Sequence, residues 1–151
     1  MKGYLPILLL LFSCTTVSLV PEQNIVSESG IIKVYGKRYK EGVSSTKIFI
    51  VFYNISKDFL YIPYTDIRCK KNELYVDREI PLDARFIKTQ IELFKQGVLI
   101  NPDESRDLLI ICKDQKELEI EIKNIYSTQS TIGPNLKLIR VASNLKWKPE
   151  K

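Results

Sequence analysis

The chain has 151 residues, which is enough for one ordinary domain with a short targeting segment and too few for a large multidomain enzyme. Its 44% hydrophobic, 10% aromatic and 27% charged residues exclude disordered, collagen-like and polytopic membrane proteins. With 23 Lys and Arg against 18 Asp and Glu the net charge is only +5, and the absence of histidine excludes Ser-His-Asp catalysis, Cys-His catalysis and histidine-ligated metal sites.

The amino terminus has the layout of an export signal. Lys2 supplies a positive charge, and the apolar run 5–12 has the length of the hydrophobic region of a secretory signal peptide. This run is too short to cross a bilayer by itself. We therefore expect the protein to be exported.

The next residues resemble the lipobox of bacterial lipoproteins. In Leu11-Phe12-Ser13-Cys14 a small residue precedes a cysteine at the end of the apolar run, and Phe12 fits the looser lipoboxes of spirochaetes. The resemblance implies cleavage before Cys14, a diacylglycerol on its sulfur and a further acyl chain, such as palmitate, on the new amino group. Such chains hold a domain on a membrane essentially permanently. Ordinary cleavage near residues 16–18, or retention of residues 4–20 as an uncleaved anchor, are the alternatives.

This interpretation divides the chain into three parts. Residues 1–13 are the signal peptide, residues 14–30 the lipidated terminus and tether, and residues 31–151 the folded domain. Residues 15–30 are rich in Ser, Thr, Glu and Asn and show no sustained period, as expected of a tether that ends in the first sheet edge.

From residue 31 onward, short apolar or alternating runs are separated by turn residues, which predicts an all-β sandwich or barrel. Charged and apolar residues alternate over 117–123, which predicts a half-buried strand. Its core-facing residues should be Leu118, Ile120 and Ile122, and its solvent-facing residues should be Glu117, Glu119 and Glu121. Residues 47–53 are apolar on both faces and predict a central strand. Further strands are predicted at 31–35, 59–62, 73–77, 91–94, 106–113 and 136–141.

Two turns are predicted from their residue types. Residues 54–58 should join strands 47–53 and 59–62 in a hairpin. Residues 101–105 place Pro102 and Asp103 at the central positions of a type I turn. The Asn-Ile-Ser at the start of the first turn is an N-glycosylation acceptor in eukaryotic secretory proteins, but beside a lipobox a role in the turn is favoured.

One stretch, which includes the strand predicted at 91–94, also argues for a helix. Between residues 82 and 97 four apolar residues approach helical spacing: Phe86, Ile87, Ile91 and Phe94. Gly97 is placed to end the helix as a C-cap. We expect one short helix near 82–96.

The cysteine count agrees with export. With Cys14 acylated, Cys69 and Cys112 remain as an even pair in an oxidising compartment. Cys69 lies among polar residues, where a free thiol would be exposed, and this favours a disulfide between the two. The alternative is a pair of buried thiols, since Cys112 ends the apolar run 108–112.

The order of these elements is similar to that of the immunoglobulin-like β-sandwiches of bacterial lipoproteins. The similarity rests on a doubly apolar strand ending in Asn-X-Ser, its hairpin mate and a Pro-Asp-Glu-Ser turn before further strands, over residues 31–141. It implies a single antiparallel sandwich of about seven to eight strands. Such sandwiches serve adhesion, scaffolding or ligand presentation more often than catalysis.

A candidate binding patch interleaves cations with aromatic residues: Tyr35, Lys37, Arg38, Tyr39 and Lys40. Its chemistry suits anionic lipid head groups or a polyanionic glycan, and the alternative is a hairpin loop whose tyrosines close the core. Nucleic acid is not expected, since an exported protein rarely meets it. Trp147 is interpreted as a core-covering residue rather than an exposed anchor.

The sequence contains no recognisable catalytic, cofactor-binding or metal-binding motif. Together these features predict a non-enzymatic lipoprotein of the cell envelope, anchored to the outer membrane at its periplasmic face or at the cell surface. We expect it to bind a protein or matrix partner and to need no cofactor. The alternatives are a periplasmic inhibitor or accessory subunit, and a hydrolase that works without histidine.

Overall fold

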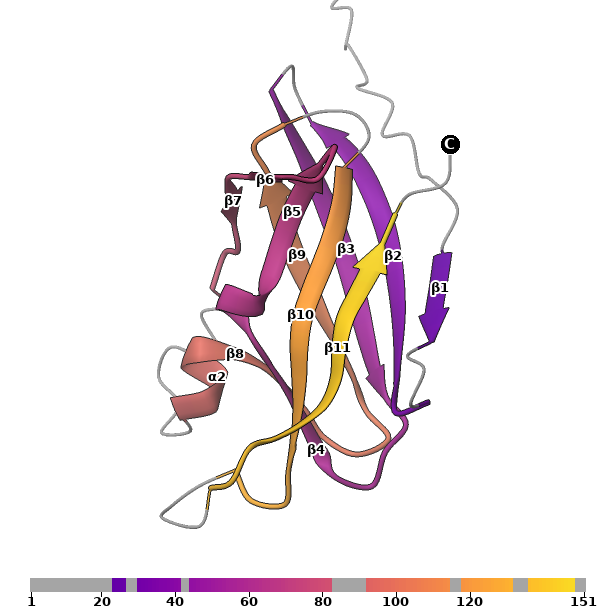
Figure 1. The fold of residues 1–151 in the computed structure, drawn as a ribbon, viewed down its shortest axis with the longest axis vertical. Coiled ribbons are helices and arrows are strands. Elements are labelled where there is room, and N and C mark those ends of the chain that lie inside the picture. The colour runs from indigo at the N-terminus through magenta and orange to yellow at the C-terminus, as the bar shows by residue number, and fades with distance from the viewer. Residues whose placement is uncertain are drawn as a thin grey trace, which may run out of the picture.

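The computed structural model describes residues 23–26, 30–41, 44–82, 92–114, 118–131 and 136–148. These residues form two antiparallel β-sheets whose buried side chains share one core. In Figure 1, β5, β10 and β11 lie in front of β2, β3 and β9. The expected all-β sandwich is confirmed. Among the described residues, no helix has the length and apolar character needed to cross a membrane.

The first sheet, sheet A, has the strand order β1-β2-β3-β9-β7. Its strands are β1 (Gln23–Val26), β2 (Ile32–Glu41), β3 (Ser45–Asn54), β7 (Arg78–Glu79) and β9 (Ser105–Cys112). β2 and β3 form one long hairpin, and β1 adds to its free edge. β1 lies within residues 15–30, where the sequence predicts a tether that ends in the first sheet edge.

The second sheet, sheet B, is built around β10. Its strands are β4 (Phe59–Pro63), β5 (Ile67–Lys71), β6 (Leu74–Val76), β8 (Gly97–Ile100), β10 (Leu118–Thr128) and β11 (Ile139–Trp147). β11 pairs along one side of β10, and β5 and β4 pair along the other. The 3-10 turn η1 (Tyr64–Asp66) separates β4 from β5, so the two strands follow one another along the same side of β10.

The predicted hairpin between residues 47–53 and 59–62 is wrong. β3 pairs with β2 and β9 in sheet A, whereas β4 pairs with β10 and β8 in sheet B. Both edges of β3 are occupied by longer partners, so no edge remains for β4. Residues 55–58 instead carry the chain from one sheet to the other.

The side chain of Asn54 organises this crossover. It is fully buried, and its amide nitrogen donates to the carbonyl oxygens of Asp58, at 2.8 Å, and Ile100, at 3.1 Å. Its amide oxygen accepts from the backbone N–H of Ser56 at 2.9 Å and from the Ser56 hydroxyl at 2.7 Å. Both hydrogens of the amide nitrogen and both lone pairs of the amide oxygen are therefore used, and the Asn-Ile-Ser sequence acts here as a turn.

The second turn exists but is not of type I. The N–H of Glu104 donates to the carbonyl of Asn101 at 3.2 Å, which closes the turn. Asp103 has a φ of 56°, and a positive φ at this position belongs to a type II turn. An aspartate tolerates this left-handed conformation better than most side chains do.

The core lies between the sheets. On β3, Ile48, Ile50 and Phe52 are fully buried and alternate with half-buried or exposed residues. Trp147 at the end of β11 is only 1% exposed, in agreement with its predicted core position. Residues far apart in the chain thus meet on the inner faces of the two sheets.

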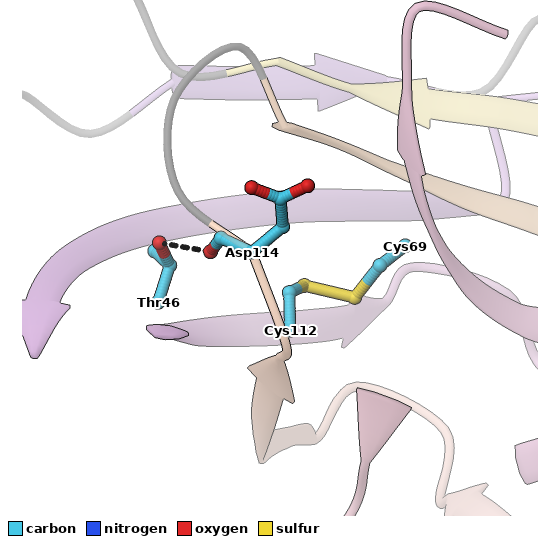
Figure 2. The surroundings of a disulfide bond; sticks show 4 residues. All are labelled: Thr46, Cys69, Cys112 and Asp114. Carbon is cyan, nitrogen blue, oxygen red and sulfur yellow. Dashed lines mark hydrogen bonds between the residues drawn. A yellow bond between two sulfur atoms is a disulfide. The ribbon is translucent and has the colours of Figure 1, made fainter. Parts of the chain in front are cut away.

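A disulfide joins the two sheets across this core. Cys69 of β5 and Cys112 at the end of β9 are bonded, with their Cα atoms 6.0 Å apart. Figure 2 shows Thr46, which pairs with Cys112 in sheet A, donating to the carbonyl oxygen of Asp114 at 2.9 Å. Cys69 is fully buried because its side chain faces the core from β5. The sequence did not predict this strand, because the residues on either side of Cys69 are polar.

The predicted helix is present as α2 (Glu92–Gln96), so the strand predicted at 91–94 is wrong. Residues 83–91 lie outside the described part of the chain. Leu93 of α2 packs on Tyr61 and Leu99, which form a small second cluster on the outer face of sheet B. Burial, with Tyr64 and Asp66 nearby, raises the pKa of Tyr61 to about 12.

Gly97 directly follows α2 but is not the predicted left-handed C-cap, because its φ is not positive. It begins β8 instead, opposite Pro63. A Cβ atom here would meet the carbonyl oxygen of Ile62 and lie 2.6 Å from Cε2 of Tyr61. Glycine is therefore required where the Tyr61 ring covers the edge of the strand.

Candidate binding surface

The sequence-predicted patch lies in β2 rather than in a hairpin loop. Tyr35 is half-buried and pairs with Val51 of β3. The backbone positions of the other patch residues pair with residues 46–49 of β3, and their side chains lie outside the described structure: Lys37, Arg38, Tyr39 and Lys40. Cys14 also lies outside the described residues.

A different surface is formed by the hairpin of β5 and β6, on the outer face of sheet B. Asn72 and Glu73 connect the two strands with φ values of 49° and 66°. Positive φ at both central residues is the signature of a type I′ turn, which suits the twist of a two-residue hairpin. The turn presents Leu74 and Tyr75, which are 72% and 52% exposed.

Three cations surround the exposed ring of Tyr75. The Arg68 guanidinium lies 5.3 Å from the ring centroid, the Lys70 ammonium 5.1 Å and the Lys123 ammonium 5.3 Å. All three are within the range of a cation–π interaction. Because Arg68 and Lys70 come from β5 and Lys123 from β10, the cluster spans three neighbouring strands.

The carboxylate of Glu121 lies beneath this cluster. It accepts hydrogen bonds of 3.0 Å from the Lys70 ammonium and 3.0 Å from the Tyr75 hydroxyl. Burial raises the pKa of Glu121, but the hydrogen bonds from Lys70 and Tyr75 and the positive charges of Lys70 and Lys123 outweigh it and lower the pKa overall. The hydrogen bond between Lys70 and Glu121 in turn raises the pKa of Lys70. Both side chains are therefore charged over the physiological range.

The prediction that the glutamates of residues 117–123 face solvent is wrong where the structure describes them. Glu119 and Glu121 are each only 6% exposed, and Glu117 lies outside the described residues. Glu119 pairs with the ammonium groups of Lys148 at 2.9 Å and Lys146 at 3.6 Å. The hydrogen bond from Lys148 to the Glu119 carboxylate raises the pKa of Lys148. Lysine side chains from neighbouring strands cover both carboxylates, since their long stems can lie along the sheet.

We call Arg68, Lys70, Tyr75, Glu121 and Lys123 the Tyr75 surface. It combines an exposed aromatic ring, three cations around the ring and a buried carboxylate that accepts hydrogen bonds from Lys70 and Tyr75. Among the described residues, no cluster of Cys, Asp and Glu could hold a metal ion. Tyrosine and arginine are the residue types most often found at the centre of binding interfaces.

Sequence reasoning missed this surface because its members are far apart in the chain. Lys70 and Glu121 are 51 positions apart and Tyr75 and Glu121 are 46. Arg68 lies opposite Glu121 because β5 pairs with β10, and this pairing is visible only in the folded structure. The one available signal was the alternation of Arg68, Lys70 and Glu121 with apolar residues in their strands.

No known protein family matches this chain, and no curated protein sequence matches it significantly. Among solved structures, the chain is similar to a candidate lipoprotein (ycdA) from Bacillus subtilis subsp. subtilis str. 168, with 18% sequence identity and a TM-score of 0.40. The similarity covers 82% of this chain and 39% of that one, so the chain spans well under half of the neighbour's length.

Proposed function

We propose that the protein is an exported lipoprotein of the cell envelope that acts as a non-enzymatic binding module. In this proposal Cys14 carries the membrane anchor, and the Tyr75 surface engages a protein or matrix partner. The observation that carries the binding role is the exposed Tyr75 ring, held among three cations by a buried carboxylate.

Two features of the chain support export and anchoring. The apolar run 5–12 has the length of a signal-peptide core and is followed by Ser13 and Cys14, an arrangement that resembles a lipobox. The disulfide between Cys69 and Cys112 is of a kind that persists in oxidising compartments and is rare in the cytosol. The anchor would leave the bonded domain attached to the outer membrane.

Fatty-acid labelling tests the anchor. Cells that express the full chain are grown with a labelled fatty acid, beside cells that express Cys14→Ala. The proposal predicts a labelled, membrane-bound protein that loses its label in the variant. A Cys14→Ala protein that still carries the label, or an unlabelled wild-type protein, would contradict it.

The strand arrangement supports a recognition role. Within sheet A the order β2-β3-β9-β7, and within sheet B the order β6-β5-β10-β11, correspond to strands A-B-E-D and C′-C-F-G of an immunoglobulin-like sandwich. This connectivity supports the proposal that the domain is an immunoglobulin-like sandwich. Such sandwiches present binding surfaces on rigid scaffolds, although fold alone does not specify the partner.

The charge of the Tyr75 surface favours an acidic partner. The three cations outnumber the two carboxylates beside Lys70, which are Glu121 and Glu73. Cationic surfaces attract acidic groups over roughly a Debye length, about 8 Å at physiological ionic strength. Carboxylates or sulfates on a protein or glycan can also bind in the plane of the Arg68 guanidinium. Preorganisation by Glu121 reduces the entropy lost on binding.

Co-purification with a matched control tests the binding site. The full-length protein is isolated from detergent-solubilised membranes as wild type, as Arg68→Ser with Tyr75→Ser and Lys123→Ser, and as the control Lys57→Ser with Lys113→Ser. The control residues are exposed cations in other parts of the surface. We expect a partner retained by wild type and control and lost from the Tyr75-surface variant. Equal recovery from all three would reject this site.

A further inference from the structure

The outer face of sheet A is apolar, in contrast to the charged outer face of sheet B. Its outward positions are occupied largely by aromatic and branched side chains: Tyr35, Phe49, Val51, Tyr53, Leu109 and Ile111. We call these six residues the apolar face. They alternate along their strands with core residues such as Ile50 and Ile110, which are fully buried. Both sides of β3 and β9 are thus apolar, although only one side meets the core.

The register places these side chains next to one another. Tyr35 pairs with Val51, and Phe49 pairs with Leu109, so apolar positions adjoin across each strand pair, although Asp107 lies opposite Val51 and Lys37 opposite Phe49. Phe49 at its centre is 36% exposed. Contiguous apolar surface of this kind marks a contact with a protein or a membrane.

Cations border the apolar face. Lys33 pairs with Tyr53 at one end and Lys47 pairs with Ile111 at the other, and both lysines are half-buried. Asp107, opposite Val51, adds an acidic side chain to the described outward positions of β9. Aromatic rings bordered by lysines are typical of surfaces that lie at the boundary between lipid head groups and acyl chains.

The proposed anchor joins the domain on this same sheet. From Cys14 to Gln23, where β1 begins, there are nine residue steps (23 − 14 = 9). A fully extended chain of that length reaches about 30 Å at most. β1 is the edge strand of sheet A, next to β2. The anchor therefore keeps the domain close to the bilayer, and the acyl chains enter the bilayer beside the apolar face.

From this placement we infer that the apolar face rests on the surface of the membrane, with Phe49 and Tyr53 in the head-group region and Lys33 and Lys47 among anionic lipid phosphates. The inference rests on the proposed acylation of Cys14, since the anchor sets the distance. Because the two sheets face opposite ways, this orientation turns the Tyr75 surface away from the bilayer. One face then holds the domain on its membrane while the other meets the partner.

Fluorescence quenching by brominated lipids tests the contact. The full-length acylated protein is reconstituted into vesicles of phosphatidylethanolamine and phosphatidylglycerol, with or without bromine on the acyl chains. Phe49→Trp reports on the apolar face, and Tyr75→Trp is the matched control on the opposite sheet. The native Trp147 is buried and adds the same background to both. Mass spectrometry of the same samples establishes whether Cys14 is acylated.

The inference predicts a blue shift and strong quenching of the tryptophan at position 49, and neither at position 75. Acylated protein without quenching at position 49 would overturn the membrane contact and leave the anchor standing. Equal quenching at both positions would also overturn it. If position 49 is shielded from lipid by a second copy, cross-linking will trap dimers, and the apolar face is then a dimer interface instead. Protein without an acyl group overturns the anchor itself, and with it the premise of this inference.

Discussion

The Tyr75 hydroxyl donates a 3.0 Å hydrogen bond to the carboxylate of Glu121, a residue 46 positions further along the chain. This contact ties a side chain that is half in solvent to one that is almost completely buried. Lys70 donates to the same carboxylate, and its ammonium also lies near the Tyr75 ring. The orientation of the ring is therefore set in the folded protein before any partner binds.

Replacing Tyr75 with Phe should remove the hydrogen bond and keep the ring with its surrounding cations. We expect the free energy of unfolding to fall by about 1 kcal/mol, the usual value for one hydrogen bond. Urea denaturation measures the change. Tyr53→Phe, on the outer face of the other sheet, is the matched control and should leave stability nearly unchanged. An equal effect of the two substitutions would contradict the role of the Tyr75 hydroxyl.

Replacing Glu121 with Gln should destabilise the protein more than Tyr75→Phe does. Glutamine can still accept hydrogen bonds, but it leaves the nearly buried ammonium of Lys70 without its closest negative charge. We expect a loss of about 1–3 kcal/mol at neutral pH. The control is Glu73→Gln, because Glu73 is 3.7 Å from the same ammonium but its side chain is 78% exposed. A loss for Glu73→Gln as large as that for Glu121→Gln would show that burial of the pair does not matter.

The pH dependence of stability should identify the same carboxylate. The pKa of Glu121 is lowered in the folded protein from its ordinary value of 4.5, so the folded state holds fewer protons than the unfolded chain as pH decreases. Its contribution to stability is complete above pH 4.5 and is lost as pH falls through the lower folded-state pKa. Denaturation at a series of pH values should show Glu121→Gln losing less stability than wild type over this range. Parallel curves for the two proteins would refute the assignment.

The disulfide should contribute to stability through the long loop that it closes. Cys69 and Cys112 are 43 positions apart, and the chain-entropy estimate for such a loop is about 4 kcal/mol. A protein with both residues changed to Ala should lose up to this amount of unfolding free energy. Reduction of the wild-type protein should lower its stability in the same direction and leave the double variant unaffected. Unchanged stability after reduction would argue against a bond between these cysteines.

Gly97 offers a sharp test of local packing. A Cβ at this position would clash with the backbone carbonyl of Ile62 and the ring of Tyr61, so Gly97→Ala should cost about 3 kcal/mol. At Gly30 a Cβ would meet no atom within 4 Å, but the φ of 65° disfavours alanine. Gly30→Ala should therefore cost only about 1 kcal/mol. Thermal melting of the two variants compares these values, and the reverse order would contradict the observed approach of β8 to β4.

The sequence was sufficient for the fold class because alternation in individual strands is a local signal. It predicted the buried side of residues 117–123, where apolar residues recur at a period of two, and the central place of residues 47–53, which are apolar on both faces. It did not show which strands pair. The mate assigned to residues 47–53 was the next strand in the chain, whereas β3 pairs with β9 more than fifty residues later.

The candidate surface depends on this long-range pairing. Glu119 and Glu121 look like a solvated stripe in the sequence, since they alternate with apolar residues. In the fold, lysines of β5 and β11 and the residue after β11 lie over them, and this cover exists only once the three strands are in register. Cys69 was similarly obscured, because Arg68 and Lys70 beside it belong to the outer face of the same strand.

In the function that we propose, the Tyr75 surface is the part of the domain that meets a partner in the cell envelope. Its most direct test is to place a photoreactive phenylalanine analogue at position 75 in living cells, and at the exposed position of Lys57 as a control, and to irradiate both. The account predicts a discrete protein or glycan adduct from position 75 and none from position 57. The same adducts from both positions, or no adduct from position 75, would contradict it.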